Sequence, residues 1–459
     1  MMKDKYLIAL IFIVSFTLFC MPEAMRWLYL GNPTIIGGPT YLHQRIAQDM
    51  ASGRFNWYDN LSFGGRPYTY PPFFSAGIAL FSFAFPIEWA GLFFVSLFGA
   101  IGIASMFLIL KTLYPKNTSL IASVLLAASP ACVFFFSHVS SRAPPVALAL
   151  LGLYFLIEKK NRYRYQISGA LLGAATLLHI EAGLVFAIVY LLLQRDRHMA
   201  LTLTIAFAVA FSYYGPFLAA NGIPQLNAIH QEYRDREFSL QSPTIANYFY
   251  ELGGIGYITI PLAALAIIGF WKTRNFFLRG WMVFIFAITL IAERFFVYLV
   301  FPVVVLAAAG LVWVARSRRK NLAVLLVAAI LIYSAALGAM KLWEFSHEYP
   351  SKEEYNAFTW IRQNTPNDSV VFADWQWGHW VAGIANRKNF IDGYAEYAPE
   401  ADKRVEEMEN FYRTCDVPQG YNISYIYIEQ WFSNDHNMTC LSRFPLLYNE
   451  SLLLVYKAS

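Results

Sequence analysis

Charged residues are scarce in this sequence. Only 14% of its 459 residues are Asp, Glu, Lys or Arg, whereas 57% are hydrophobic and the mean hydropathy is +0.42. A typical soluble domain carries about 25% charged residues. A chain this apolar cannot hide its hydrophobic surface in one soluble core, so most of it must lie in lipid. The composition excludes a cytosolic enzyme, a disordered protein and a nucleic-acid-binding protein.

Cysteine is also rare, with four in the chain. Cys20 and Cys132 fall within apolar segments, where a thiol behaves as a small hydrophobic side chain. Cys415 and Cys440 lie in the more polar C-terminal tail, where they can form a disulfide if the tail faces an oxidising compartment. No Cys/His spacing in the sequence resembles a zinc site. The sequence also lacks the internal repeat that is typical of transporters.

What the sequence does contain is a series of long apolar runs. Eleven of them predict transmembrane helices, at about 6–21, 88–110, 119–137, 143–157, 166–180, 182–193, 200–219, 254–270, 280–291, 295–315 and 321–340. A further apolar run at 73–86 has only 14 residues and lies between prolines. Because a span needs about 20 apolar residues, we expect this run to form a helix at the membrane edge instead.

The basic residues predict the orientation of the chain. With the N-terminus inside, the inner connections carry 17 Lys and Arg residues and the outer ones carry 8. An odd number of spans then places the C-terminus outside. We therefore expect a multi-pass cell-membrane protein with a cytoplasmic N-terminus, a transmembrane module over 1–341 with a long outer loop at 22–87, and an extracytoplasmic domain over 342–459.

The tail differs from the rest of the chain in charge and in pattern. From Glu344 onward it has 9 Lys/Arg and 17 Asp/Glu, against 26 and 13 before that point. Ser351 and Glu354 have the spacing of a capping box that opens a helix. A second helix is predicted at 400–413, and strands at 369–375, 424–431 and 451–457. The tail is therefore predicted to be a soluble α/β domain. Its four N-x-S/T sequons agree with a position outside the cytosol, at Asn367, Asn422, Asn437 and Asn449.

The outer loop contains a predicted helix between Pro39 and Gly53, residues that favour the start and the end of a helix. Leu42, Ile46 and Met50 form an apolar stripe along it. Such a stripe indicates a helix that lies on the bilayer surface.

The polar faces of this helix carry His43, Arg45 and Asp49. Arg45 and Asp49 are four residues apart, so they are neighbours on the helix surface. A plain surface ion pair explains both residues, and so does a role in an active site.

Several segments together resemble one enzyme family. The outer loop has a Trp-containing turn (FNWYDN, 55–60), then Gly-Arg-Pro and Tyr-Pro-Pro ahead of the next apolar run. SHVSSRAPP at 137–145, ERFFVYLVFPVVVLAAAG at 293–310 and DWQWGHWVAGIANRKNFIDG at 374–393 follow in order. This arrangement resembles the GT-C superfamily of membrane glycosyltransferases and is most similar to the catalytic subunit of oligosaccharyltransferases. The protein O-mannosyltransferases share the loop plan more loosely.

The resemblance implies a GT-C-like polytopic helical fold of about 11 transmembrane helices. It also implies an enzyme that takes a sugar from a polyprenyl-phosphate carrier on the outer side of the membrane. In that family an Arg in a late span contacts the carrier phosphate, a role that falls on Arg294 here. The block at 374–380 corresponds to the segment that holds the acceptor, which makes Trp375, Gln376, Trp377 and His379 the candidates for acceptor binding.

The sequence departs from the family at its carboxylates. The first-loop Asp of the family falls on Gly38, and Ala143, Pro144 and Pro145 follow Arg142 where acids are expected. In the tail, Gln376 takes the place of the family's Asp. Oligosaccharyltransferases use such carboxylates to hold a divalent cation and to activate the acceptor.

Other residues in the sequence offer the same chemistry. Arg142 and Arg294 are candidates for binding the donor phosphate, because guanidinium groups bind phosphate oxygens in a bidentate manner. For the base we consider Asp49, His43 and Glu181, the last of which lies two residues after His179 between two apolar segments. Asp49 and Glu181 are also the tentative ligands for a divalent metal, Mg or Mn.

These features predict a membrane glycosyltransferase that moves a sugar or glycan from a polyprenyl-phosphate-linked donor to a protein or glycan acceptor on the outer face. Two alternatives remain open. One is a non-catalytic GT-C relative that binds lipid-linked glycan or scaffolds other membrane proteins, and the other is a true oligosaccharyltransferase with altered motifs. The expected partners are the lipid-linked donor, the acceptor and membrane lipid, with no nucleic acid.

Overall fold

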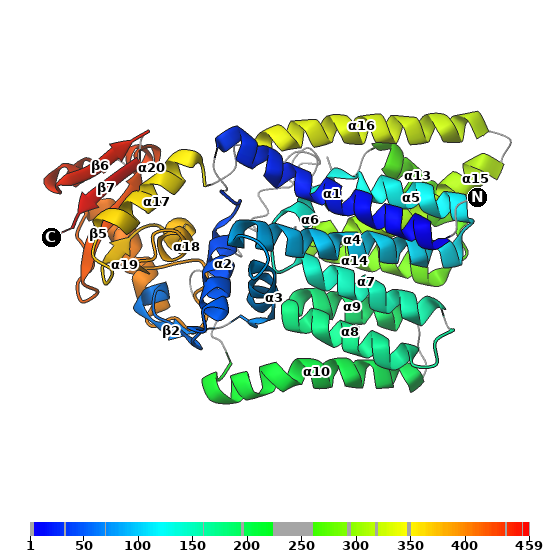
Figure 1. The fold of residues 1–459 in the computed structure, drawn as a ribbon, viewed down its shortest axis with the longest axis horizontal. Coiled ribbons are helices and arrows are strands. Elements are labelled where there is room, and N and C mark those ends of the chain that lie inside the picture. Colours follow the sequence, from blue (N-terminus) through cyan, green and yellow to red (C-terminus); the bar gives the residue numbers. More distant parts are fainter. Residues whose placement is uncertain are drawn as a thin grey trace. The chain divides into compact units, whose positions relative to one another are not determined.

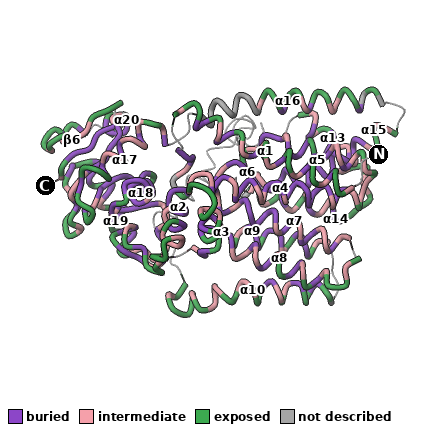
Figure 2. Tube along the Cα trace, in the orientation of Figure 1, coloured by how far each residue is buried: buried purple, intermediate pink, exposed green. Residues whose placement is uncertain are grey.

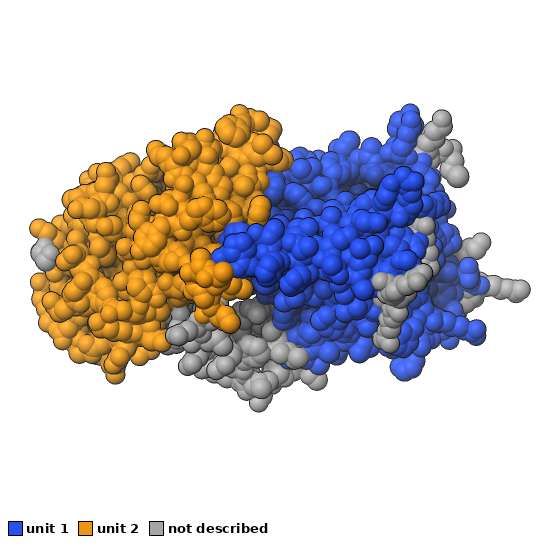
Figure 3. Space-filling model, turned by 90° about the horizontal axis from the view of Figure 1, so that it is seen from below, with its two compact units in different colours: residues 1–26, 92–216, 237–346 blue, residues 27–91, 217–236, 347–459 orange. Residues whose placement is uncertain are grey.

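The computed structural model describes residues 4–31, 34–68, 70–158, 160–193, 197–223, 260–291, 295–316, 320–346, 350–436, 438–451 and 453–458 (Figure 1). The chain divides into two compact units, which are coloured separately in Figure 3. The first, here called the helical unit, comprises Met1–Arg26, Leu92–Pro216 and Glu237–Ser346. The second, here called the mixed unit, comprises Trp27–Gly91, Phe217–Arg236 and His347–Ser459. The outer loop thus groups with the tail.

Helices form the first unit, and several of them extend beyond its bounds. They are α1 (Asp4–Leu30), α4 (Ile87–Leu113), α5 (Lys116–Ala127), α6 (Pro130–Ser137), α7 (Ala143–Glu158), α8 (Arg164–Leu178), α9 (Ile180–Leu193), α10 (Arg197–Asn221), α13 (Ile260–Lys272), α14 (Phe276–Ile291), α15 (Phe296–Arg316) and α16 (Lys320–Ser346). Every predicted apolar segment overlaps one of these helices, and 119–137 is divided between α5 and α6, which meet at a bend of 59°.

Four of the described helices are long and apolar enough to cross a membrane, or up to five if the bent pair counts as one span. The four are α1, α4, α10 and α15. The helix α7 has 16 residues and therefore rises about 24 Å, less than the roughly 30 Å of a hydrocarbon core. The prediction of several apolar helices is confirmed, and the described part of the predicted run at 254–270 is α13, since 254–259 lie outside the described residues.

Burial differs between these helices (Figure 2). The most apolar windows of α4 and α15 are 72% and 78% buried, whereas that of α10 is 6% buried. The side chains that α10 exposes include Leu201, Phe207 and Phe211. A helix that is apolar all round and exposes large hydrophobic side chains is typical of a lipid-facing position.

The mixed unit contains a sheet and the helices around it. In the outer loop it has α2 (Gly38–Ala51), β1 (Tyr58–Asp59), η1 (Ser62–Gly64), β2 (Arg66–Pro67) and α3 (Phe73–Ser82). In the tail it has α17 (Lys352–Asn364), β3 (Val370–Phe372), α18 (Trp375–Gly383), β4 (Lys388–Asn389), α19 (Ala401–Thr414), β5 (Ile423–Glu429), α20 (Gln430–Asp435), η4 (Thr439–Arg443), β6 (Leu446–Glu450) and β7 (Leu453–Lys457).

The tail forms one five-stranded sheet in the order β4-β3-β5-β7-β6. β3 runs parallel to β4 and β5, and β7 runs antiparallel to β5 and β6. The predicted α/β tail is confirmed, including the capping box in which Ser351 and Glu354 each accept a hydrogen bond from the other's backbone N–H. The prediction missed five elements of the tail, which are α18, β4, α20, η4 and the edge strand β6.

The helix α2 follows the predicted bounds, but its apolar stripe has a different partner. Leu42 and Ile46 are buried in a cluster with Tyr68, and Met50 packs against that cluster. Protein rather than lipid therefore covers the stripe. The prediction that this stripe rests on the bilayer surface is wrong, because the returning loop folds over it.

The apolar run at 73–86 contains α3, a helix of ten residues. Such a helix rises about 15 Å, too little to cross a bilayer. Phe74 and Ile78 are fully buried, whereas Leu80 and Phe83 are 68% and 75% exposed. One side of this segment thus packs on protein while the other presents apolar side chains, as expected for a helix at the membrane edge.

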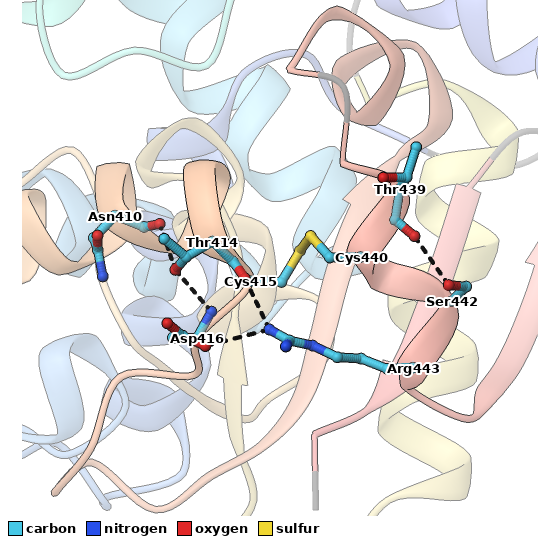
Figure 4. Close-up of a disulfide and its surroundings, with 8 residues drawn as sticks. All are labelled: Asn410, Thr414, Cys415, Asp416, Thr439, Cys440, Ser442 and Arg443. Atoms are coloured by element: carbon cyan, nitrogen blue, oxygen red, sulfur yellow. Dashed lines mark hydrogen bonds and ion pairs between the residues drawn. A yellow bond between two sulfur atoms is a disulfide. The ribbon is translucent and has the colours of Figure 1, made fainter.

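The predicted disulfide is present between Cys415, which follows α19, and Cys440 in η4 (Figure 4). Arg443 lies beside it and donates hydrogen bonds to the Thr414 carbonyl and to the Asp416 carboxylate. A cross-link that closes a loop of 25 residues removes conformations from the unfolded chain. The bond joins α19 to the segment that precedes the edge of the sheet.

Glu354 and Glu429 form a buried acidic pair between α17 and β5, 2% and 3% exposed. Burial and the neighbouring Glu429 carboxyl raise the pKa of Glu354 to about 8. The folded state therefore favours a protonated Glu354. The stability that this protonation contributes is complete below the ordinary pKa of 4.5 and is lost as the pH rises towards 8.

We expect Glu354→Gln to stabilise the full-length protein by about 1–3 kcal/mol at pH 8 and by much less at pH 4.5. Gln keeps the hydrogen-bonding shape of the capping box but never ionises. Thermal unfolding in detergent at the two pH values measures the difference. The neighbouring variant Glu353→Gln is the control and should gain no pH-dependent stability. Equal unfolding temperatures of wild type and Glu354→Gln at pH 8 would contradict the expectation.

Candidate functional site

The mixed unit holds a buried polar network that joins the outer loop to the tail. The Asp392 carboxylate accepts hydrogen bonds from Ser62 Oγ at 2.6 Å and from Asn389 Nδ2 at 2.9 Å. Arg66 Nε donates to Ser62 Oγ at 2.6 Å, and Arg66 Nη2 lies 3.8 Å from Asp392 Oδ1. All four side chains are at most 3% exposed. We call Ser62, Arg66, Asn389 and Asp392 the loop–tail network.

The two ends of this network come from motifs that carried the family resemblance. Arg66 belongs to the Gly-Arg-Pro of the outer loop, and Asp392 belongs to the end of the 374–393 segment. Burial alone would raise the pKa of Asp392, but His379 and Arg66 lower it below its usual value. The carboxylate is therefore held in its charged form, as expected for a buried acid with a cationic partner and several hydrogen-bond donors.

A second ion pair fixes the outer loop on α2. Arg45 Nη2 contacts Asp59 Oδ2 at 2.5 Å, and Asp59 Oδ1 accepts a hydrogen bond from the Leu61 N–H. Asp59 thus holds the turn that follows it and also binds Arg45. Of the two accounts that the sequence left open, the surface ion pair of Arg45 with Asp49 does not form, because the loop folds back and offers Arg45 the buried carboxylate of Asp59.

Asp49 keeps only a weak ion pair. Its Oδ1 lies 3.8 Å from Arg54 Nη2, and the side chains of Asp49 and Arg54 are 35% and 74% exposed. Partial burial raises the pKa of Asp49, although Arg45 and Arg54 act in the opposite direction. A half-exposed carboxylate with a raised pKa has the character of a general base that water and an acceptor can reach.

His43 and His379 are both buried in the mixed unit, 2% and 5% exposed. His43 Nδ1 lies 3.2 Å from Ser75 Oγ, and His379 Nδ1 lies 3.9 Å from Asp392 Oδ1. Burial, followed by the repulsion of His379, lowers the pKa of His43 to about 3. Burial also lowers the pKa of His379, although Asp392 opposes this shift. His43 is therefore a neutral imidazole at pH 7, and its ring shares a hydrogen bond with Ser75 Oγ.

The block at 374–380 forms the first turns of α18. Asp374 caps the helix by accepting a hydrogen bond from the Gln376 N–H, and its carboxylate also accepts one from Tyr412. Trp375 and Trp377 are each 6% exposed, and the Trp377 ring packs on Tyr427 and Phe432. Gln376 is exposed. Of the four predicted acceptor-binding residues, only Gln376 is open to solvent within this chain.

Gly378 has a packing role in this segment. It lies inside α18, where a Cβ atom would come within 2.0 Å of the Ile391 carbonyl oxygen. Glycine is therefore required because the helix packs directly on the backbone of the segment that ends at Asp392. This close approach lets Asn389 Nδ2 donate a hydrogen bond to the Gly378 carbonyl at 2.8 Å.

The helical unit contains a separate cationic group. Arg142 directly precedes α7, with its backbone N–H 3.3 Å from Ser140 Oγ. Arg142 and Arg26 both lie close enough to His138 to act on its ring electrostatically. Arg26 is only 1% exposed and lies one helical turn after Glu23, which is fully buried. We call Arg26, His138 and Arg142 the cationic group.

Arg26 and His138 were not predicted as site residues. The available signal was a pair of ionisable residues, Glu23 and Arg26, inside an otherwise apolar helix. Charges within apolar segments are costly and usually mark functional sites. For His138 the signal was its position in SHVSSRAPP, the motif that also contains Arg142.

Glu181 lies in the first turn of α9, and His179 forms the C-cap of α8 directly before it. An acid in the first turn of a helix interacts favourably with the helix dipole. Arg294, the other predicted phosphate-binding residue, lies outside the described residues.

The residues that the structure describes do not form a fitting metal site. In these ranges no group of three or more His, Cys, Asp or Glu side chains is arranged to hold an ion. Asp49, one of the two tentative ligands, has Arg45 and Arg54 as its main charged neighbours. Arg54 Nη2 lies 3.8 Å from Asp49 Oδ1, so this carboxylate already has a cationic neighbour.

The family model for dolichyl-phosphate-mannose-protein mannosyltransferases matches residues 66–216. No curated protein matches the chain. The matched range begins at Arg66 in the outer loop, ends within α10 and includes Arg142 and Glu181.

Solved structures match over nearly the whole chain. The Archaeoglobus fulgidus oligosaccharyltransferase AglB, in complex with an inhibitory peptide and a dolichol-phosphate, is 15% identical with a TM-score of 0.67, and the match covers 99% of this chain and 74% of that one. The complex of the A. fulgidus enzyme with Zn and sulfate is 16% identical with a TM-score of 0.67, over 97% and 72%. ArnT from Cupriavidus metallidurans, bound to undecaprenyl phosphate, is 14% identical with a TM-score of 0.64, over 98% of both chains.

These matches define the class of protein by its fold. The chain has the fold of the GT-C membrane glycosyltransferases, and the resemblance inferred from its sequence is confirmed. Its apolar helices and these relatives make it a multi-pass membrane protein. It is similar both to oligosaccharyltransferases and to ArnT.

Proposed function

We propose that this protein is a membrane glycosyltransferase that transfers a sugar from a polyprenyl-phosphate-linked donor to an acceptor on the outer face of the membrane. The observation that carries the proposal is the cationic group of Arg26, His138 and Arg142 in the helical unit. Arg26 and Arg142 both act electrostatically on the His138 ring, and guanidinium groups bind phosphate oxygens in a bidentate manner. The ligands of the matched structures, dolichol-phosphate and undecaprenyl phosphate, support a lipid phosphate as that anion.

The proposed reaction exchanges one bond for another. The bond between the sugar C1 and the phosphate oxygen breaks, and a bond forms between C1 and the acceptor oxygen or nitrogen. The departing polyprenyl phosphate keeps the bonding electrons, and the acceptor proton passes to a base. Arg142 and Arg26 stabilise the charge that develops on the phosphate, and Arg294 is proposed to assist them. No step is assigned to a metal ion.

In the mixed unit, we assign the base to Asp49. Its partial exposure and its raised pKa suit proton transfer, whereas the depressed pKa of His43 makes that imidazole a poor base. Glu181, in the helical unit, is kept as the second candidate for the base. Gln376 contacts the acceptor, while Trp375, Trp377 and His379 hold the α18 segment that presents it.

Replacement of Arg142 by Gln is expected to raise the KM for the lipid-linked donor by about tenfold to a hundredfold, because a charge-assisted contact to the phosphate is lost. Steady-state kinetics with varied donor concentration measure this change. Arg162→Gln is the matched control, since Arg162 is an exposed arginine of the same unit whose guanidinium stacks on Tyr163. A donor KM for Arg142→Gln that equals that of Arg162→Gln would remove Arg142 from the site.

The experiment that tests the function uses purified full-length protein in lipid vesicles. Undecaprenyl-phosphate-linked sugars with a radiolabel in the sugar are supplied together with acceptor fractions of peptide, lipid and glycan. The proposal predicts that the label leaves the lipid extract and appears in one acceptor fraction. Transfer to peptides that contain the N-x-S/T sequon, and to no other acceptor, would favour the oligosaccharyltransferase alternative.

The same vesicles separate an enzyme from a binding protein. If donor binding is tight but the label remains on the lipid with every acceptor, the protein is a non-catalytic relative. The empty carboxylate positions at Gly38 and at Ala143–Pro145 favour that second candidate. If neither binding nor transfer occurs, both candidates fail.

A further inference from the structure

The mixed unit contains a cleft that none of the proposed roles uses. It has a volume of about 750 Å³ and lies between the outer loop and one edge of the tail sheet. Its floor includes Ser369 and Val370, where β3 begins, and Ser424, where β5 has just begun. The 374–380 block follows the opposite, carboxyl end of β3. The cleft is therefore distinct from the segment assigned to the acceptor.

Positive charge predominates in the lining of this cleft. Its described lining residues include the cationic side chains of Lys388, Arg404 and Lys457 and a single carboxylate, Asp368. Lys388 lies in β4 and Lys457 ends β7, so separate strands hold the two amines. Lys457 is exposed and Lys388 is half-buried. The cleft thus offers mobile ammonium groups to an anionic ligand.

Arg404 is the most constrained of these cations. It is 7% exposed, lies 4.5 Å above the Tyr421 ring and 5.5 Å from the Phe63 ring, and donates through Nη1 to the Phe390 carbonyl at 2.6 Å. Its buried Nε–H has no acceptor among the described residues. Burial lowers the pKa of the guanidinium. A buried cationic N–H without an acceptor is costly, and the aromatic rings on either side of the guanidinium hold the Arg404 charge at the lining of the cleft.

Aromatic rings line the rest of the cleft. Tyr58, Phe63, Tyr421 and Tyr425 contribute to it, and Tyr58 is 47% exposed. Gly65 supports the Tyr58 ring: its φ is +135°, and a Cβ atom there would come within 2.7 Å of Tyr58 Oη. The ring therefore lies directly on backbone. A tyrosine ring that is already fixed loses little conformational entropy when a ligand binds, and its flat face is electron-rich.

We propose that this cleft binds a saccharide that carries a carboxylate, such as a hexuronate unit of a glycan. The aromatic faces accept the partly positive C–H groups of a sugar ring, and the cationic side chains bind its carboxylate. The tyrosine hydroxyls and the exposed backbone of Gly64 satisfy its hydroxyl groups. An acidic peptide would use the same cations but would leave the aromatic faces without a matching ring. The site does not depend on the proposed transfer reaction, because it binds its ligand without the lipid-linked donor.

Isothermal titration calorimetry of the full-length protein in detergent, with no donor present, tests this site. The probes are trigalacturonate, its neutral counterpart galactotriose, a tetra-aspartate peptide and inorganic phosphate. We expect saturable binding of trigalacturonate at least about tenfold tighter than that of the other three probes, since a carboxylate and a sugar ring are both required. Absence of trigalacturonate binding, or equal affinity for galactotriose, tetra-aspartate or phosphate, would overturn the proposal.

Two variants locate the binding. Lys388→Gln together with Lys457→Gln should weaken trigalacturonate binding by about tenfold or more and leave galactotriose unaffected. Tyr58→Ala should weaken both sugars. Lys352→Gln is the control, because Lys352 is an exposed lysine in the first turn of α17 and does not line the cleft. If the double variant binds as tightly as Lys352→Gln, the ligand occupies some other site.

Discussion

Asp49→Asn is expected to lower kcat by about 10²- to 10⁴-fold, the usual contribution of a general base, while the protein remains folded. Asn has the shape of Asp but cannot accept the acceptor proton. The fold should tolerate the change, because the ion pair of Asp49 with Arg54 is long and largely exposed. Rates of sugar transfer from the lipid-linked donor, together with thermal unfolding of the same preparation, measure both quantities.

The pH dependence distinguishes a base from a structural residue. Partial burial raises the pKa of Asp49 above its ordinary 3.8, so wild-type transfer should fall as the pH drops through this raised value. The acidic limb of the profile should vanish in Asp49→Asn. Asp416→Asn changes an exposed acid elsewhere in the mixed unit and should keep the full rate. A kcat for Asp49→Asn within a few fold of the wild-type value would show that Asp49 is not the general base. Glu181 would then be the remaining candidate, and Glu181→Gln would be measured next.

Asp392→Ala is expected to destabilise the mixed unit by about 3–5 kcal/mol, the usual cost of removing one partner from a buried ion pair. The change leaves the guanidinium of Arg66 buried beside an empty space and removes the acceptor for Ser62, Asn389 and the Tyr394 N–H. The pKa of Asp392 is depressed, mainly by His379 and Arg66 against the effect of burial. The stability that the carboxylate contributes is therefore present above its ordinary pKa of 3.8 and is lost as the pH falls through the depressed value.

A surface ion pair in the same unit provides the control. Asp416 lies 3.4 Å from Arg443, and their side chains are 70% and 49% exposed (Figure 4). Asp416→Asn should cost less than about 1 kcal/mol. Chemical denaturation followed by tryptophan fluorescence compares the two variants at pH 7. Similar midpoints for Asp392→Ala and Asp416→Asn would mean that the loop–tail network does not hold the unit together.

Local patterns predicted local structure well. Pro39, Gly53 and the spacing of the apolar residues predicted α2 to within two residues at each end, and the Ser351–Glu354 spacing predicted the start of α17. The apolar runs predicted the helices of the membrane module. In each case the determining interactions lie within one or two helical turns, so the sequence contains them in a short window.

Long-range partners were not predictable in the same way. Arg45 has Asp49 one turn away in sequence, yet it binds Asp59. Ser62 and Asp392 are 330 residues apart, and nothing local to either residue indicates the other. For the same reason the sequence assigned the outer loop to the module over 1–341. In the structure, residues 27–91 group with the tail. Such contacts depend on how whole elements pack.

The block at 374–380 was misinterpreted for a local reason. The preceding β-branched run predicted a strand that extended to Trp375, whereas β3 ends at Phe372. Asp374 is a good N-cap residue, and Trp377, Trp380, Val381 and Ile384 have helical spacing. These two signals together favour a helix, and the close packing of Gly378 on Ile391 explains a glycine inside it.

The nature of the sugar donor is the central claim, and a double-label competition tests it most directly. Full-length protein in vesicles receives undecaprenyl-phosphate-linked glucose labelled with carbon-14 and UDP-glucose labelled with tritium, and the isotope ratio of the glycosylated product is measured. Carbon-14 product with tritium at background is the predicted result, and it should weaken in Arg142→Gln. Tritium product with carbon-14 at background would contradict the account, because no lipid phosphate would then leave from the cationic group.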